Sequence, residues 1–171
     1  MTPVPDLHVF LDIEALGIRA GAAIVQLGAV AFTLDPGHLG ETFHRHIKPH
    51  PALHLEHDTL QWHARQGTWP VPPSVSPVFL EHAMGDFRQW LADLGPVKTF
   101  WSWGSTYDFP LIQEACRLIS RETPWEYWQC ACARTIWRMA FPDRKHDPRP
   151  HHALGDAQAG ARDLIEAWKN L

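Results

Sequence analysis

Cysteine is scarce in this chain of 171 residues, which contains only Cys116, Cys130 and Cys132. Such a small odd number argues against a disulfide framework and predicts reduced thiols in a cytoplasmic protein. Long apolar runs are also lacking, since the longest, around residues 24–32, is far too short to span a bilayer. The first residues, MTPVPDLH, do not have the charged-then-apolar pattern of a signal peptide. We therefore expect neither a membrane protein nor a secreted disulfide scaffold.

An excess of positive charge is lacking as well. The chain has 15 Lys and Arg residues against 19 Asp and Glu residues, and its formal net charge is −4. A broad basic face for gripping long duplexes is therefore not expected. Internal repeats and dividing linkers are absent too, and nine Trp and eight Phe residues can fill a core. We expect residues 1–171 to form a single domain.

Four carboxylates and one histidine do occur, in a fixed order along the chain. Asp12 and Glu14 lie in LDIEALG, Asp108 lies in WGSTYDFP, and His151 and Asp156 lie in HHALGDAQAG. Hydrolysis of a phosphodiester needs anionic ligands for divalent cations and a base that accepts a proton from water. Together these residues predict a nuclease centre with two Mg²⁺ or Mn²⁺ ions. The four carboxylates equal the net charge of −4, so two divalent ions would bring the formal charge to zero.

The surrounding segments predict where these acids lie. Asp12 and Glu14 follow an apolar run typical of a strand end, where alternate residues share a face and Ile13 points into the core. Asp108 precedes a helical segment, so it could be only the N-cap of that helix. Asp156 lies early in a C-terminal helix, beside its apolar stripe. A partly buried carboxylate in that place needs a cation or hydrogen bonds.

These motifs resemble those of the DEDDh-type 3'-to-5' exonucleases of the RNase H-like superfamily. DIEALG is similar to the first motif, GSTYDFPLI to the second and HHALGD to the third. Further segments resemble a narrower branch, the small stand-alone bacterial and phage exoribonucleases: GAAIVQLGAV (21–30), TLQW (59–62), PWEYW (124–128) and RT (134–135). Two positions depart from that branch, His63 where a second Trp is common and Cys132 where an acidic residue is common.

The resemblance implies a role for each motif residue. His151, separated from the last aspartate by four residues, takes the histidine position and would be the general base, whereas His152 stands where a sister group has tyrosine. An imidazole, with an unperturbed pKa of about 6.5, can accept a proton at neutral pH. Four residues would hold the two ions: Asp12, Glu14, Asp108 and Asp156.

The resemblance also implies a substrate site. The 3'-terminal base would pack near Leu16 and Trp62, although for Trp62 a place in the core is an equal alternative. Arg149 lies in the proline-rich loop PDRKHDPRPHH, where it would contact phosphate or else belong to a solvated loop. The implied substrate is the 3' end of RNA, single-stranded or overhanging, in preference to DNA. A DNA exonuclease, an inactive RNase H-like module that binds nucleic acid or partner proteins, and a homodimer are the alternatives left open.

The expected fold is α/β, an RNase H-like mixed β-sheet flanked by helices in the order β-β-β-α-β-α-β-α. Strand 8–13 is expected at the centre of the sheet. The other strands are expected at residues 24–33, 42–48, 98–103 and 127–131, and the helices at residues 59–65, 77–94, 109–119, 134–140 and near the C-terminus.

Histidines are dense between residues 44 and 57. Five of them could form a transition-metal site: His44, His46, His50, His54 and His57. Strand alternation gives a simpler account, in which His44 and His46 share one exposed face and the others lie in a proline-bounded loop. The Cys130-x-Cys132 pair leaves a zinc site as a second, weaker alternative.

Overall fold

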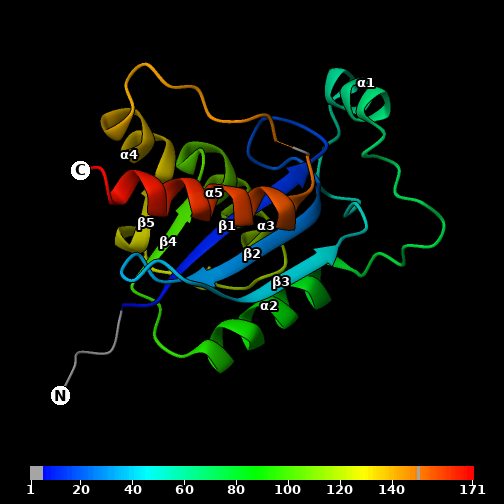
Figure 1. Cartoon of the computed structure of the whole chain (residues 1–171). Helices are drawn as coiled ribbons and strands as arrows, with labels where there is room; N and C mark the ends of the chain where they lie inside the picture. The colour runs from blue at the N-terminus through cyan, green and yellow to red at the C-terminus, as the bar shows by residue number, and fades with distance from the viewer. Residues whose placement is uncertain (1–5, 150) are drawn as a thin grey trace.

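The computed structural model describes residues 6–149 and 151–171, and its strands form one mixed sheet covered by helices on both faces (Figure 1). The strand order is β3-β2-β1-β4-β5. The strands are β1 (His8–Ala15), β2 (Ile24–Phe32), β3 (Leu39–His46), β4 (Thr99–Ser102) and β5 (Cys130–Cys132). The helices are α1 (His57–Gln66), α2 (Leu80–Leu94), α3 (Ser105–Leu118), α4 (Ala133–Ala140) and α5 (Ala153–Trp168), with a 3-10 turn η1 (Tyr127–Gln129) before β5. The expected mixed sheet and its flanking helices are confirmed.

Strand β1 lies at the centre of the sheet, antiparallel to β2 and parallel to β4. Its side chains alternate between two apolar cores. Val9 and Ile13 lie in the core that α2 and α3 cover, whereas Phe10 lies in the core beneath α4 and α5. Because alternate strand residues share a face, Asp12 and Glu14 lie on the same side as Phe10, toward α5. The prediction that the two acids point away from Ile13 is confirmed.

Helix α5 lies unusually close to the sheet because glycines face it at the contact points. A Cβ atom on Gly28 of β2 would lie 2.2 Å from the backbone nitrogen of Leu154. A Cβ atom on Gly160 of α5 would lie 2.4 Å from Cζ of Phe10. The first turn of α5 therefore rests directly on β2, and that turn carries Asp156 to the strand that holds the first two acids.

Helix α3 begins earlier than the position of Pro110 predicts. The backbone amides of Tyr107 and Asp108 donate to the carbonyl of Gly104 at 2.7 and 3.3 Å, which closes a helical turn before the proline is reached. Gly104 is the N-cap, and Asp108 lies inside the helix. The alternative that Asp108 is only an N-cap is therefore wrong.

Helix α2 begins at Leu80 rather than residue 77. The segment before it is held as an isolated bridge to the end of β3, because the amide of Val78 donates to His46 and its carbonyl accepts from Lys48. Helices α1 and α2 both lie between β3 and β4, where the expected order has a single α. Helices α4 and α5 both follow β5, where the expected order again has a single α. Within residues 6–149 and 151–171, no helix has the length and apolar character needed to cross a membrane.

Candidate active site

A cavity of about 670 Å³ opens at the carboxyl end of β1, and we call it the carboxylate cavity. Helix α1, the first turn of α5 and the segment before α5 surround it. Four of the five motif residues line it, together with aromatic and basic side chains: Asp12, Glu14, Trp62, His63, Trp103, Tyr107, Arg149, His151 and Asp156. The fifth motif residue, Asp108, is buried and does not line the cavity.

Three side chains of the motif come close enough to share one ion. Glu14, His151 and Asp156 each offer a ligand atom, and these atoms all lie within 4.8 Å of one another. Glu14 is 8% exposed and Asp156 is 7% exposed, so water reaches both carboxylates poorly. His151 adopts φ = 56°, in the left-handed region that residues other than glycine rarely occupy. The chain holds this imidazole at the cavity in an unfavourable backbone conformation, as is frequent at functional sites.

The carboxylates repel one another in their buried setting. Burial raises the pKa of Asp12 well above its usual value, and the charges of Asp108, Glu14 and Asp156 raise it further. Burial, together with the charges of Asp156 and Asp108, raises the pKa of Glu14 to about 7. Burial also raises the pKa of Asp108 to about 7 and raises the pKa of Asp156. A cation at this place would stabilise the ionised forms of all four groups.

One buried oxygen supports a cation directly. The Oδ1 atom of Asp156 is buried and has no hydrogen-bond partner among the described residues. A buried acceptor without a donor is costly, so such an atom needs an ion or an ordered ligand. Carboxylate oxygens are the ligands that Mg²⁺ and Mn²⁺ prefer. The residues at the cavity therefore fit hard divalent cations.

The predicted substrate residues are placed differently from one another. Trp62 lines the cavity with 36% of its surface exposed, and its ring meets that of His151 edge-on at 4.6 Å between centroids. Arg149 also lines the cavity, but its Nη2 donates to Asp163 at 2.6 Å and its guanidinium stacks over Trp103. Leu16 is fully buried and does not line the cavity.

Several residues that the motifs did not single out shape the cavity. His63 is buried, and its ring nitrogens lie 3.0 Å from the carbonyl oxygen of Ala15 and 2.7 Å from Oγ1 of Thr68, which fixes α1 against the end of β1. The hydroxyl of Tyr107 donates to the carbonyl of Gly17 at 3.1 Å. The sequence offered a signal for His63, since it departs from the tryptophan that is common in similar chains.

Comparison with known proteins identifies the family. Residues 7–168 match the family model described as a 3'-5' exoribonuclease Rv2179c-like domain. The chain belongs to this exonuclease family. The comparison with curated proteins gives no match.

Solved nucleases share the fold of this exonuclease family member. The structure of cell-death related nuclease 4 (CRN-4) has 17% identity and a TM-score of 0.73, over 94% of this chain and 63% of that one. The nuclease domain of 3'hExo, a DEDDh family member bound to rAMP, has 16% identity and a TM-score of 0.63, over 95% and 91%. Exonuclease I of E. coli with a dT13 oligonucleotide has 11% identity and a TM-score of 0.72, over 96% and 41%. The chain thus spans under two thirds of two of these relatives.

The two neighbouring histidines of this exonuclease domain face different partners. His151 lines the carboxylate cavity, whereas His152 is the N-cap of α5 and accepts from the amide of Gly155 at 3.3 Å. The ring of His152 lies 4.6 Å from that of His44 on β3. The DEDDh resemblance is confirmed by the family match, whereas the assignment of the histidine position to His151 stays a prediction.

Proposed function

We propose that this exonuclease hydrolyses phosphodiester bonds from the 3' end of single-stranded or overhanging RNA, with two Mg²⁺ or Mn²⁺ ions as cofactors. The observation that carries the proposal is the meeting of buried, mutually repelling carboxylates and a histidine at one cavity. RNA is favoured over DNA because the matching family model is one of exoribonucleases. Structures with the same fold hold rAMP in one case and a DNA oligonucleotide in another, so the fold alone does not choose.

Four residues would hold the ions: Asp12, Glu14, Asp108 and Asp156. When bound, two such ions would act as Lewis acids that polarise the phosphate and stabilise the charge of the leaving 3' oxygen. The imidazole of His151 would accept the proton of the attacking water. One of its ring nitrogens lies within 4.8 Å of a carboxylate oxygen of Glu14 and of Asp156, so the imidazole faces two of the groups that would hold the ions.

The cavity also offers contacts for the end of a strand. Its volume, about 670 Å³, lies in the usual range for a small-ligand site, and a terminal nucleotide rather than a duplex fits it. We propose that Trp62 packs against the terminal base and that Arg149 contacts phosphate while Asp163 holds its guanidinium in place. We propose that Leu16 contributes to the core and does not contact the base, since its side chain is fully buried and does not line the cavity. Its neighbour Ile18, 69% exposed, lines the cavity and replaces it as the apolar contact.

A degradation assay tests the proposal. Labelled single-stranded RNA, the same sequence as DNA, a duplex with a 3' overhang and a circular strand are incubated with Mg²⁺, Mn²⁺ or EDTA. We expect stepwise shortening from the 3' end, faster for RNA than for DNA, and no reaction in EDTA or on the circle. DNA degraded as fast as RNA would refute the RNA preference, and cleavage of the circle would refute the exonuclease. A cytoplasmic location, a single domain over residues 1–171 and a homodimer stay predictions.

A further inference from the structure

Three histidines gather on the β3 side of the first turn of α5, and we call them the three-histidine cluster. His44 and His46 come from β3, and His152 comes from the N-cap of α5. Ring centroids of His44 lie 4.7 Å from His46 and 4.6 Å from His152. One ring nitrogen from each residue can be chosen so that all three lie within 4.8 Å of one another.

The close contact between α5 and the sheet brings the cluster together. His44 pairs in register with Gly28, the residue that lies against Ala153 and Leu154. Two residues along β3, His46 shares the face of His44, because strand side chains alternate. The predicted common face for these two histidines is therefore confirmed, but both side chains are half-buried rather than exposed, and the third member comes from the far end of the chain. Within the described part of the chain, His50, His54 and His57 belong to no group of three candidate ligands.

The hydrogen bonds of the cluster leave nitrogen lone pairs for a metal. Nε2 of His44 lies 3.3 Å from Oε1 of Gln26, and an amide oxygen can only accept, so the proton is on Nε2 and the lone pair is on Nδ1. Metal-bound histidines are commonly oriented in this way, by a second nitrogen that donates to an oxygen. Nδ1 of His46 is buried and has no hydrogen-bond partner among the described residues. A metal ion would satisfy it.

We propose that the three-histidine cluster binds one transition-metal ion, Zn²⁺ above all, at a site separate from the carboxylate cavity. Three neutral imidazoles and an open fourth position form a typical tetrahedral zinc site. The same ligands are poor for Mg²⁺, which prefers oxygen. In a tetrahedral zinc site the nitrogens lie about 3.3 Å apart, so the rings must close inward. The side chain of His152 is exposed, so its ring can turn toward the other two once its capping bond from Gly155 is broken.

Metal binding would change the start of α5. In the metal-free protein, Nδ1 of His152 accepts the amide proton of Gly155, so the ring proton is on Nε2. A metal on Nδ1 takes the lone pair that accepts from Gly155. A metal on Nε2 binds only after the proton moves to Nδ1, which can then no longer accept from Gly155. Zinc binding therefore costs the capping bond next to His151. This cost lowers the metal affinity below that of a preformed site. It also links metal binding to the backbone next to His151, which lines the carboxylate cavity.

Calorimetric titration with Zn²⁺ in excess Mg²⁺ tests the site, because Mg²⁺ competes for carboxylate ligands but not for imidazoles. We expect one equivalent of Zn²⁺ to bind, and Co²⁺ to give the strong visible absorption of tetrahedral coordination. His44→Gln and His152→Asn should each lower the affinity at least as much as the about 10–100-fold that the loss of a supporting group causes. Asparagine is a good N-cap, so His152→Asn removes a ligand and keeps the helix start. His82→Ala, an exposed histidine on α2, is the matched control and should bind like the parent.

The outcomes separate this site from the carboxylate cavity. Binding that persists in Asp12→Asn and disappears in His44→Gln supports the proposal. Absence of saturable binding, unchanged binding in both histidine variants, or loss in Asp12→Asn overturns it. Circular dichroism checks that each variant is folded, and His152→Asn carries the test if His44→Gln is not. No nuclease activity is measured, so this proposal and the proposed function fail independently.

Discussion

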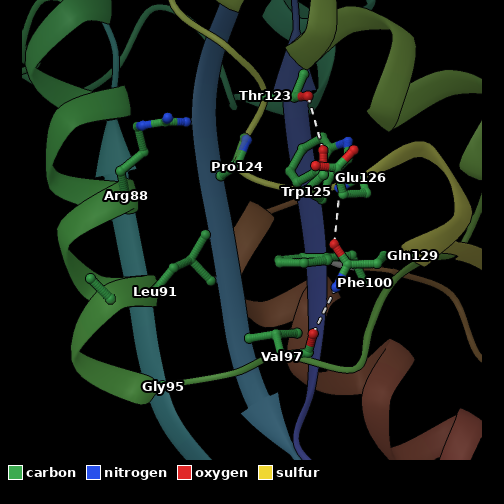
Figure 2. Close-up of a pocket in the computed structure, with 11 residues that line it drawn as sticks. Arg88, Leu91, Gly95, Val97, Phe100, Thr123, Pro124, Trp125, Glu126 and Gln129 are labelled. Atoms are coloured by element: carbon green, nitrogen blue, oxygen red, sulfur yellow. Dashed lines mark hydrogen bonds between the residues drawn. The ribbon is translucent and has the colours of Figure 1, made fainter.

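The carboxylate cavity and the hollow in Figure 2 are both lined by polar groups, but only the hollow satisfies them within the protein. The hollow, about 450 Å³, lies between α2, β4 and the turn before β5. There Nε2 of Gln129 donates to the carbonyl of Val97 at 2.8 Å, and Oε1 of Gln129 accepts from the amide of Glu126 at 2.9 Å (Figure 2). Arg88 and Thr123 donate to backbone carbonyls as well.

In the carboxylate cavity, in contrast, the described residues do not satisfy every polar group. Asp156 has a buried oxygen without a partner, and the pKa values of Glu14 and Asp108 rise to about 7. A protein selected only for stability would pair or remove these groups, since unpaired buried charge is costly. The contrast agrees with a hollow that supports the fold and with the proposed binding of ions at the carboxylate cavity. Five predictions sharpen or break this contrast.

The largest effect is expected from Asp12→Asn. Loss of one ion ligand should misplace both ions and lower the exonuclease rate by about 10³-fold or more. The metal-free variant should melt at a higher temperature than the parent, because one repelling charge is gone. Asp86→Asn, which removes an exposed carboxylate paired with Arg45, is the control and should change neither the rate nor the melting temperature by much. A fully active Asp12→Asn enzyme would rule out the two-ion mechanism.

A smaller loss of rate is expected from His151→Asn. Asparagine tolerates the left-handed backbone conformation of this position, so the variant removes the imidazole with little change of fold. A missing general base lowers rates by about 10²–10⁴-fold. His152→Asn should be mild in Mg²⁺, because it keeps the cap of α5. If the two variants showed the reverse order in single-turnover assays, the base would be His152.

Glycine substitutions compare close packing at the cavity with open space elsewhere. Gly28→Ala would push the first turn of α5 off β2, and overpacking of this kind costs about 1–3 kcal/mol. It should also lower activity, since the same turn carries Asp156. Gly85→Ala, inside α2 with no atom near its Cβ position, should instead stabilise by about 0.5–1 kcal/mol. Urea unfolding of both variants checks the sign, and equal effects would contradict the close approach of α5.

The contribution of Glu14 and Asp108 to the stability of the metal-free protein should fall as pH rises. The pKa values of Glu14 and Asp108 are about 7 in the folded state, above the about 4 of unfolded carboxyl groups. Between these values the folded state binds more protons than the unfolded state, so the free energy of unfolding decreases from about pH 4 through pH 7. Unfolding in EDTA at pH 5 and pH 8 measures the fall. The parent is compared with Glu14→Gln, because burial also lowers the pKa values of four histidines, which acts in the opposite direction: His8, His44, His46 and His63. Added Mg²⁺ should reduce the fall, and an equal change with pH in the parent and in Glu14→Gln would contradict the crowding of the acids.

The sequence predicted best what depends on local geometry. Asp12 and Glu14 share a face because a strand repeats every two residues, whatever it packs against. The role of Leu16 as a base contact fared worse, because a register shift between Glu14 and Ala15 interrupts the alternation just before it. Leu16 is fully buried, and its exposed neighbour Ile18 lines the cavity instead.

Contacts between distant segments were beyond the sequence. The approach of His152 to His44 depends on the pairing of β2 with β3 and on the missing side chain of Gly28. Neither follows from a local pattern. The start of α3 was not predicted either. Pro110 indicated a first turn at that residue, whereas the backbone already closes a helical turn at Gly104. The motif predicted the acids of the candidate site, whereas packing decided which other residues lie beside them.

The smallest effect is expected in the hollow of Figure 2, from Gln129→Ala. The substitution removes two hydrogen bonds, from Gln129 to Val97 and from Glu126 to Gln129, and leaves the carboxylate cavity intact. Each such bond contributes about 1 kcal/mol, so unfolding should become easier by about 1–2 kcal/mol. The exonuclease rate in Mg²⁺ should stay within about twofold of the parent, because this loss is small against a typical folding free energy of about 5–15 kcal/mol. Gln89→Ala, which removes an exposed bond to Asp93, is the matched control. A large loss of activity in Gln129→Ala with stability retained would show that the hollow serves the reaction, and the contrast between the two regions would fail.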